Sequence, residues 1–387
     1  MTKLFDKDTE TDLMMIPGPV RVHPRIQRAM NYSIVGHRTK PFIDLFNKTV
    51  EMFKEYLHTK YDLYIITGSG SAALEAGITN WINREASTKI LCFNNGKFSE
   101  RNYDIAKNFG ANAIKVDIKL GEPVTPEIVE EWLKRHPDTR MVTVCHNETS
   151  TGVLSPIKEI GTVVKRYGAL LMADGVTSVA GTYVCPEDQN IDILCSGCQK
   201  SWGLPPGLSI ICVSPRAWEM LPKLSPTSYF NLREFKAEGG MPWTPAISLV
   251  YGLNEALKMM LEETEAKRTA RHKWAAELVR TGVKALGLKL FAKEGYESPV
   301  VTAIQIPPGV KDDVIRKEMD KMGVQIAGGQ SEMKGSIWRI ATMNTCRELE
   351  VLATFAVFEV VLAKNGYKFE LGTSLRVIQS KILQQTT

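Results

Sequence analysis

Seven short apolar runs between residues 63 and 213 read LYIIT (63–67), KILCFN (89–94), AIKVDI (113–118), MVTVCH (141–146), ALLMAD (169–174), DILCSG (192–197) and LSIICV (208–213). They alternate with longer helical patterns, among them 71–84, 99–109 and 156–167. The runs are apolar throughout, which is typical of strands that helices cover on both faces. We therefore predict an α/β fold with a mainly parallel seven-stranded sheet between helices.

A second, smaller unit is expected after this sheet. The pattern from 246 to 287 predicts one long unbroken helix, a spine that joins two domains with a boundary near residue 264. Beyond it, 298–306, 324–329 and 336–342 are predicted strands, and 349–363 is a predicted helix. The expected divisions are an N-terminal arm (1–14), a large domain (15–263) and a small C-terminal α+β domain (264–387).

Composition excludes several functional classes. The 387 residues are 44% hydrophobic and 24% charged, with a net charge of +5, and Lys and Arg are scattered, so nucleic acid is not an expected partner. The start of the chain lacks the apolar core of a secretory signal, which favours a cytoplasmic location. The apolar run 351–363 contains Glu359 and is too short to cross a membrane, so a buried helix is expected.

The seven cysteines suggest no disulfide framework, and the Cys195–Cys198 pair lacks the two further ligands of a zinc site, so no metal is expected.

The first polar cluster is the segment 67–71, Thr-Gly-Ser-Gly-Ser, between a strand and a helix. Its free amides and hydroxyls suit a phosphate at a helix N-terminus. A tight turn that merely needs glycine is an equally simple interpretation. Gly68, Gly70 and Ala73 also match a dinucleotide-binding fingerprint, but that fingerprint expects an acidic residue at the end of the second strand, where Asn94 and Asn95 stand.

Two further clusters follow later strands of the same sheet. Asp174 ends one strand and can face a ligand, although an isolated Asp here is more often a helix N-cap. Lys200 follows the strand 192–197; in a crowded, partly dry site a lysine loses its proton and attacks carbonyl groups, whereas most lysines are surface charges. The combination of phosphate cradle, acid and lysine at strand ends favours a shared site.

With these clusters in place, residues 15 to 363 resemble the class V aminotransferases of pyridoxal-phosphate (PLP) fold type I, most of all the alanine-glyoxylate and serine-pyruvate (serine-glyoxylate) aminotransferases. The segments that carry the resemblance are Ile16–Pro19, Gly36–Arg38, Gly68–Gly70, Asn95–Phe98, His146–Gly152, Asp174, Gln199–Lys200, Pro205–Gly207, Trp243–Pro245 and Trp338–Ile340.

The resemblance implies a role for each matching residue. Lys200 would form the Schiff base with PLP, and Asp174 would pair with the pyridine nitrogen. The other implied cofactor-binding residues are Ser69, Gly70, Ser71 and Gln199 at the phosphate, Phe98 and Val176 on the two ring faces, and Thr149 through its hydroxyl. Arg339 would grip the substrate carboxylate, with Gly18 beside it. His146 and Glu148 are expected to shape the loop and not to perform chemistry.

Three departures from the family pattern bear on cofactor affinity and specificity. Many relatives have tryptophan where this chain has Phe98, several have tyrosine near Met241, and the run Ala341-Thr342-Met343 replaces a glycine-containing one.

The implied activity is a ping-pong transamination from alanine, serine or aspartate to a 2-oxo acid such as glyoxylate or pyruvate. Two other enzymes stay open: a cysteine desulfurase, which needs a mobile cysteine ahead of the substrate arginine, and, from the fingerprint alone, an NAD-dependent dehydrogenase. A non-catalytic binding protein is the third alternative.

The resemblance also implies a homodimer with shared active sites, in which Thr244 reaches the partner's cofactor phosphate. The alternative is that Thr244 simply N-caps a helix that begins at Pro245.

Overall fold

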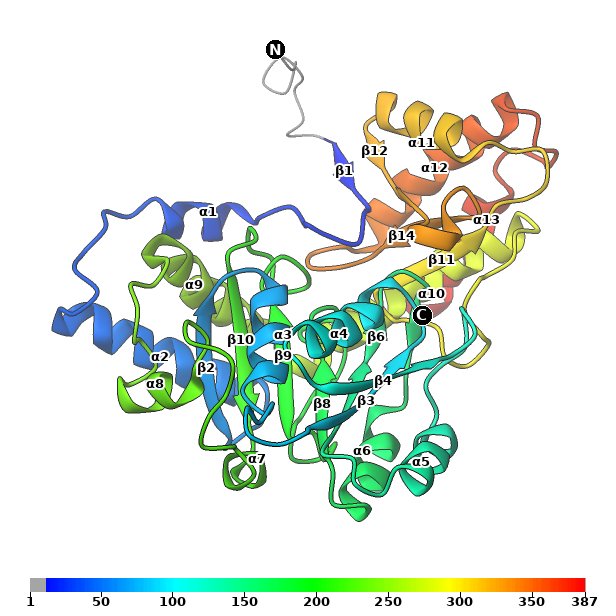
Figure 1. The fold of residues 1–387 in the computed structure, drawn as a ribbon. Coiled ribbons are helices and arrows are strands. Elements are labelled where there is room, and N and C mark those ends of the chain that lie inside the picture. Colours follow the sequence, from blue (N-terminus) through cyan, green and yellow to red (C-terminus); the bar gives the residue numbers. More distant parts are fainter. Residues whose placement is uncertain (1–11, 387) are drawn as a thin grey trace, which may run out of the picture.

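A computed structural model describes residues 12–386 and contains the predicted sheet (Figure 1). Its seven strands are β2 (Asp62–Thr67), β3 (Lys89–Asn94), β4 (Asn112–Asp117), β5 (Met141–Cys145), β8 (Leu170–Asp174), β9 (Ile193–Gly197) and β10 (Leu208–Val213). Their order is β2-β10-β9-β8-β5-β3-β4. Only β10 runs antiparallel to its neighbours among these strands. The predicted α/β fold with a mainly parallel seven-stranded sheet is confirmed.

Helices cover both faces of this sheet, which explains why its strands are apolar throughout. On one face α3 (Gly70–Thr79) packs on alternate strand residues such as Cys92 and Met172. On the other face the intervening residues, such as Leu91 and Leu171, pack against a second set of helices. That set comprises α2 (Lys40–Tyr56), α5 (Pro126–Arg135), α6 (Ile157–Arg166) and α9 (Ile247–Glu263). The remaining elements before α9 are α1 (Pro24–Met30), α4 (Lys97–Asn108), β6 (Asn147–Glu148), β7 (Val153–Leu154), α7 (Pro215–Glu219) and α8 (Leu232–Ala237).

The C-terminal region forms a smaller α+β unit with its own hydrophobic core. Its three-stranded sheet has the order β11-β14-β13. Its elements are α10 (Glu265–Ala285), β11 (Val301–Gln305), α11 (Asp312–Lys321), β12 (Val324–Gln325), β13 (Ala327–Gly328), η1 (Ser331–Met333), β14 (Ile337–Ala341), α12 (Glu348–Lys364) and α13 (Thr373–Thr386). The apolar run 351–363 lies in α12, and its Glu359 carboxylate accepts a hydrogen bond from the Ser374 amide at 2.7 Å.

The prediction of one unbroken spine helix is wrong, because the chain turns at Thr264. Thr264 has φ 71° and ψ 147°, so α9 ends at Glu263 and α10 starts at Glu265. The Thr264 hydroxyl accepts a hydrogen bond from the Lys267 amide and caps the second helix. A domain boundary near residue 264 remains our proposal.

The segment before α1 connects the two units (Figure 1, blue). β1 (Leu13–Met14) pairs in parallel with β12, and the Met15 carbonyl accepts a hydrogen bond from Ala341 in β14. The chain then crosses to α1, which packs on α9. Most of the expected arm, residues 1–11, lies outside the described part of the chain. Within residues 12–386 no helix combines the length and apolar character that a membrane span requires.

Candidate active site

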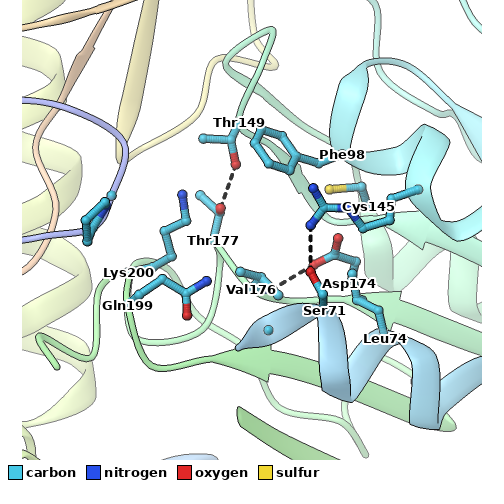
Figure 2. A pocket seen from close by; sticks show the side chains of 14 residues that line it. Ser71, Leu74, Phe98, Cys145, Thr149, Asp174, Val176, Thr177, Gln199 and Lys200 are labelled. Carbon is cyan, nitrogen blue, oxygen red and sulfur yellow. Dashed lines mark hydrogen bonds between the residues drawn. The ribbon is translucent and has the colours of Figure 1, made fainter. Parts of the chain in front are cut away.

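A cavity of about 220 Å³ lies beside the carboxyl ends of β5, β8 and β9 (Figure 2). Parallel α/β sheets place their ligand sites at this edge. Nine of the predicted residues lie in its wall, contributed by segments far apart in the sequence. The lining is Gly18, Pro19, Gly70, Ser71, Leu74, Phe98, Arg101, Cys145, Thr149, Asp174, Val176, Thr177, Gln199 and Lys200.

Lys200 lies in the cavity wall and is only 7% exposed. Its Nζ donates a hydrogen bond to the Pro17 carbonyl, and a Cβ on Gly18 would come within 2.7 Å of its Cδ. Burial, and then the nearby Arg339 charge, lower the pKa of Lys200 from 10.5 to about 8. A substantial neutral fraction near physiological pH makes this amine a nucleophile and a base.

Asp174 faces Lys200 across the cavity, from the end of β8 (Figure 2). Burial raises the pKa of its carboxyl group to about 6, against the lowering effect of a 2.9 Å hydrogen bond from the Val176 amide. No helix begins within the turn that follows, so the N-cap interpretation is wrong. A buried carboxylate at the far end of a cavity is suited to a cationic ring nitrogen.

The segment 67–71 runs from the end of β2 into the first turn of α3, and its residues Gly70 and Ser71 line the cavity. Gly70 is required there, because a Cβ would lie 2.7 Å from a Val176 methyl group. Gly197 is required for the same reason, because a Cβ at that position would lie 2.7 Å from the Gly70 Cα. The Gln199 amide oxygen is buried and has no hydrogen-bond partner among the described residues. Ser69 is exposed at the N-cap of α3 and does not line the cavity.

Phe98 and Val176 approach the cavity from opposite sides (Figure 2). Glu148 fixes Phe98, because its fully buried carboxylate accepts hydrogen bonds from the Phe98 amide at 3.2 Å, the Ser99 amide at 2.8 Å and the Ser150 hydroxyl at 2.6 Å. Glu148 therefore organises the start of α4, as the loop-shaping interpretation expects. His146 is also buried, and burial lowers the pKa of its imidazole to about 4, which removes it as a base near neutral pH.

Arg339 lies beside the cavity and not in its wall. Its guanidinium donates to the Gly328 carbonyl at 2.8 and 3.0 Å and to the Thr149 carbonyl at 3.2 Å. The Thr149 hydroxyl, in turn, lies 2.6 Å from the Thr177 hydroxyl. Burial lowers the pKa of Arg339 to about 10, so it remains cationic at neutral pH. Its hydrogen-bond partners here are neutral carbonyls. A substrate carboxylate can therefore displace them and bind the guanidinium through two charge-assisted hydrogen bonds.

Thr244 is exposed and does not line this cavity. It lies with Thr67, Met241 and Trp243 around a separate small hollow. The N-cap interpretation is wrong, because α9 begins at Ile247 after Ala246, whose amide instead donates to the Thr67 hydroxyl at 3.1 Å.

Sequence reasoning missed several residues of the cavity wall, notably Pro19, Leu74, Arg101, Cys145 and Thr177. Cys145 and Thr177 carry a weak signal, since each lies next to a strand end. Arg101 is three residues after Phe98, hence on the same helix face, and this spacing is a signal that could have found it.

The rival enzyme classes find little support in the geometry. Asn94, at the end of β3, donates to the Asp117 side chain at 2.6 Å and does not present an acid to a ribose. Cys346 is buried away from the cavity wall, and burial raises the pKa of its thiol to about 12. The Cys195 and Cys198 thiols donate to the carbonyls of Ala73 and Pro205. Residues 12–386 contain no cluster of His, Cys, Asp and Glu that could hold a metal.

This sheet and site define the class of protein: a PLP enzyme of fold type I. Comparisons with known proteins then give the family. Residues 26–348 match the class-V aminotransferase family, and the chain belongs to it. An uncharacterised aminotransferase of Methanocaldococcus jannaschii is 41% identical over 93% of this chain and 95% of its own.

Two further relatives show that substrates vary within the family. An L-aspartate–glyoxylate aminotransferase of Paracoccus denitrificans is 30% identical over 98% of both chains. The crystal structure of ureidoglycine–glyoxylate aminotransferase from Bacillus subtilis, also 30% identical, superposes with a TM-score of 0.89 over 95% of this chain and 97% of its own.

The family is PLP-dependent, and the residues present fit this cofactor. The cavity joins a buried amine, a buried acid and a glycine-shaped helix start, which match the aldehyde, the pyridine nitrogen and the phosphate of PLP. The Gln199 side chain also lines this wall, and its NH2 group is of the donor type that a phosphate oxygen accepts.

Proposed function

We propose that this class V aminotransferase transfers the amino group of alanine, serine or aspartate to a 2-oxo acid such as glyoxylate or pyruvate, in a ping-pong reaction. The observation that carries the proposal is the pairing of Lys200 and Asp174 across one buried cavity, each with a pKa moved toward neutrality. When bound, PLP supplies a carbonyl that accepts amino groups and a ring that takes up electrons.

Lys200 and Asp174 divide the chemistry between them. Lys200 Nζ would hold the cofactor through its aldehyde carbon and, as a free amine, would take up the proton of the substrate Cα. Its low pKa serves both roles, since only the neutral amine is a nucleophile or a base. Asp174 holds a proton on the pyridine nitrogen, and its burial strengthens that interaction. Gly70, Ser71 and Gln199 bind the phosphate, with Ser69 at the edge of the cradle, and Phe98 and Val176 orient the ring.

Arg339 gives the reaction its preference for amino acids and 2-oxo acids. Its guanidinium already donates to the carbonyl of Thr149, a residue of the cavity wall. A substrate carboxylate that replaces these neutral carbonyls gains a charge-assisted, bidentate contact. Gly18 is required beside the reacting amine, because a Cβ there would come within 2.7 Å of the Lys200 Cδ and 3.1 Å of its Nζ.

A half-reaction screen tests the proposal. The holoenzyme is mixed with alanine, serine, aspartate, glutamate or lysine, and the visible absorbance of the Lys200-bound cofactor is followed. We expect rapid bleaching with one or more of the first three, and recovery on addition of glyoxylate or pyruvate. A protein that bleaches only with glutamate or lysine, or that releases sulfur from cysteine, would contradict the assignment.

We also propose that the active form is a homodimer with shared sites, in which Thr244 reaches the partner's cofactor phosphate. Two observations support it. Thr244 lies outside the cavity of its own protomer, and the loop after α1 exposes large apolar side chains, with Tyr32 69% and Ile34 70% accessible. Sedimentation of the holoenzyme with PLP measured in each species tests this: a monomer that keeps cofactor and full activity would refute shared sites.

A further inference from the structure

Arg101 is a cavity residue to which the aminotransferase chemistry above gives no task. It extends from α4, one turn after Phe98, and its guanidinium carbon lies 5.6 Å from the centre of the Phe98 ring. Its Nη1 donates a hydrogen bond of 2.8 Å to the Ser71 hydroxyl, in the first turn of α3 (Figure 2). A fixed positive charge therefore lies against the expected phosphate cradle.

Arg101 has no acidic partner in direct ion-pair contact among the described residues, although its charge also acts on the Asp174 carboxylate across the cavity. None of the ion pairs of the described residues includes Arg101. The nearest acid along the chain, Glu100, already pairs with Lys97 at 2.8 Å and Lys115 at 2.9 Å. No direct ion pair thus holds the guanidinium at the cavity, and the hydrogen bond to Ser71 is the contact that places it there.

A phosphate ester is the anion that this position suits. Near pH 7 a phosphate monoester carries roughly −1.5 to −2 charges, whereas the groups of the cradle, the amides of Gly70 and Ser71, the Ser71 hydroxyl and the Gln199 amide, are all neutral. In the wall formed by the described residues, two side chains are cationic, Lys200 and Arg101. Of these two, Lys200 would be bonded to the cofactor aldehyde or act as a neutral amine, so Arg101 is the side chain whose charge is left for the phosphate.

We propose that Arg101 is the cation that binds the cofactor phosphate, with Ser71 as its positioning partner. The small side chain at position 71 lets the guanidinium reach over the start of α3, so the helix amides and the arginine fork converge on one anion. The inference rests on the proposed role of residues 68–71 as phosphate cradle. With Arg101 as a ligand, the phosphate becomes a main source of cofactor affinity alongside the ring.

The test compares PLP with pyridoxal, which has the same ring and aldehyde but no phosphate. Cofactor-free wild type, Arg101→Gln, Arg101→Lys and the exposed control Arg135→Gln are titrated with each compound, and binding is followed by tryptophan fluorescence. We expect Arg101→Gln to weaken PLP binding at least about tenfold, about 1.4 kcal/mol, while pyridoxal binding changes less than about threefold. Arg101→Lys should lie between, and Arg135→Gln should match wild type. Inorganic phosphate should compete with PLP less effectively in Arg101→Gln than in wild type.

Two results would overturn the inference. Unchanged PLP affinity in Arg101→Gln would show that the phosphate does not need this charge. An equal loss for PLP and pyridoxal would show that Arg101 acts on the ring through Phe98. Failure of the wild-type protein to bind PLP would instead refute the proposed function itself, so the two failures are distinguishable.

Discussion

Replacing Lys200 by methionine should stabilise the cofactor-free protein while abolishing turnover. Burial lowers the pKa of Lys200 from 10.5 to about 8. Between these values the unfolded chain binds more protons at this site than the folded chain, so the wild-type free energy of unfolding rises with pH across this window. At pH 7 the buried amine costs the wild type about 3 kcal/mol, which Lys200→Met avoids; at pH 9.5 the same difference is about 1.4 kcal/mol.

The pH dependence isolates this effect from other consequences of the substitution. Lys200→Met also removes the hydrogen bond from Nζ to the Pro17 carbonyl, but that loss changes little with pH. The stability of Lys200→Met relative to wild type should therefore fall by about 2 kcal/mol between pH 7 and pH 9.5, whatever its absolute value.

Urea unfolding of the two cofactor-free proteins at several pH values measures this difference. The control is Lys40→Met, because the side chain of Lys40 is 84% exposed, and its relative stability should change by less than about 0.5 kcal/mol over the same range. A pH-independent difference between Lys200→Met and wild type would refute the low pKa. Residual transamination by Lys200→Met would refute the catalytic role of the amine.

Three further substitutions test other parts of the site. Asp174→Asn should keep the fold but lose at least about 99% of turnover, since an amide cannot hold a protonated ring nitrogen by charge; steady-state rates equal to wild type would contradict this. Glu148→Gln should lower the free energy of unfolding by about 3 kcal/mol, roughly 4 °C in melting temperature for a chain of this length, because its amide group meets backbone donors; calorimetry should show a far smaller shift for Glu122→Gln, which removes a partly exposed ion pair. Arg268→Gln removes donors to the Ser201 and Ala180 carbonyls and should speed amide exchange in residues 196–206; unchanged exchange would show that Arg268 does not hold the loop of Lys200.

The C-terminal half shows where local patterns cease to predict the structure. Helix-favouring residues such as Glu, Ala, Lys and Arg continue across Thr264 without a glycine or proline, and this local sequence does not predict a residue with φ 71°. α9 packs on the large sheet and α10 on the small one. The chain turns at Thr264 because two separate cores have to be covered, and this demand arises only in the folded molecule.

The sequence alone determined the sheet, its two covered faces and the edge at which Asp174 and Lys200 meet. These features follow from local properties, since a continuous apolar run specifies a buried parallel strand and the carboxyl ends of such strands share one edge. The tertiary structure decided what surrounds that edge. Glu148 holds Phe98 from 50 residues away, Arg101 turns onto Ser71, and Arg339 lies on the Thr149 carbonyl from 190 residues away. Hydrogen bonds of such separation depend on how helices and loops pack, which no spacing along the chain encodes.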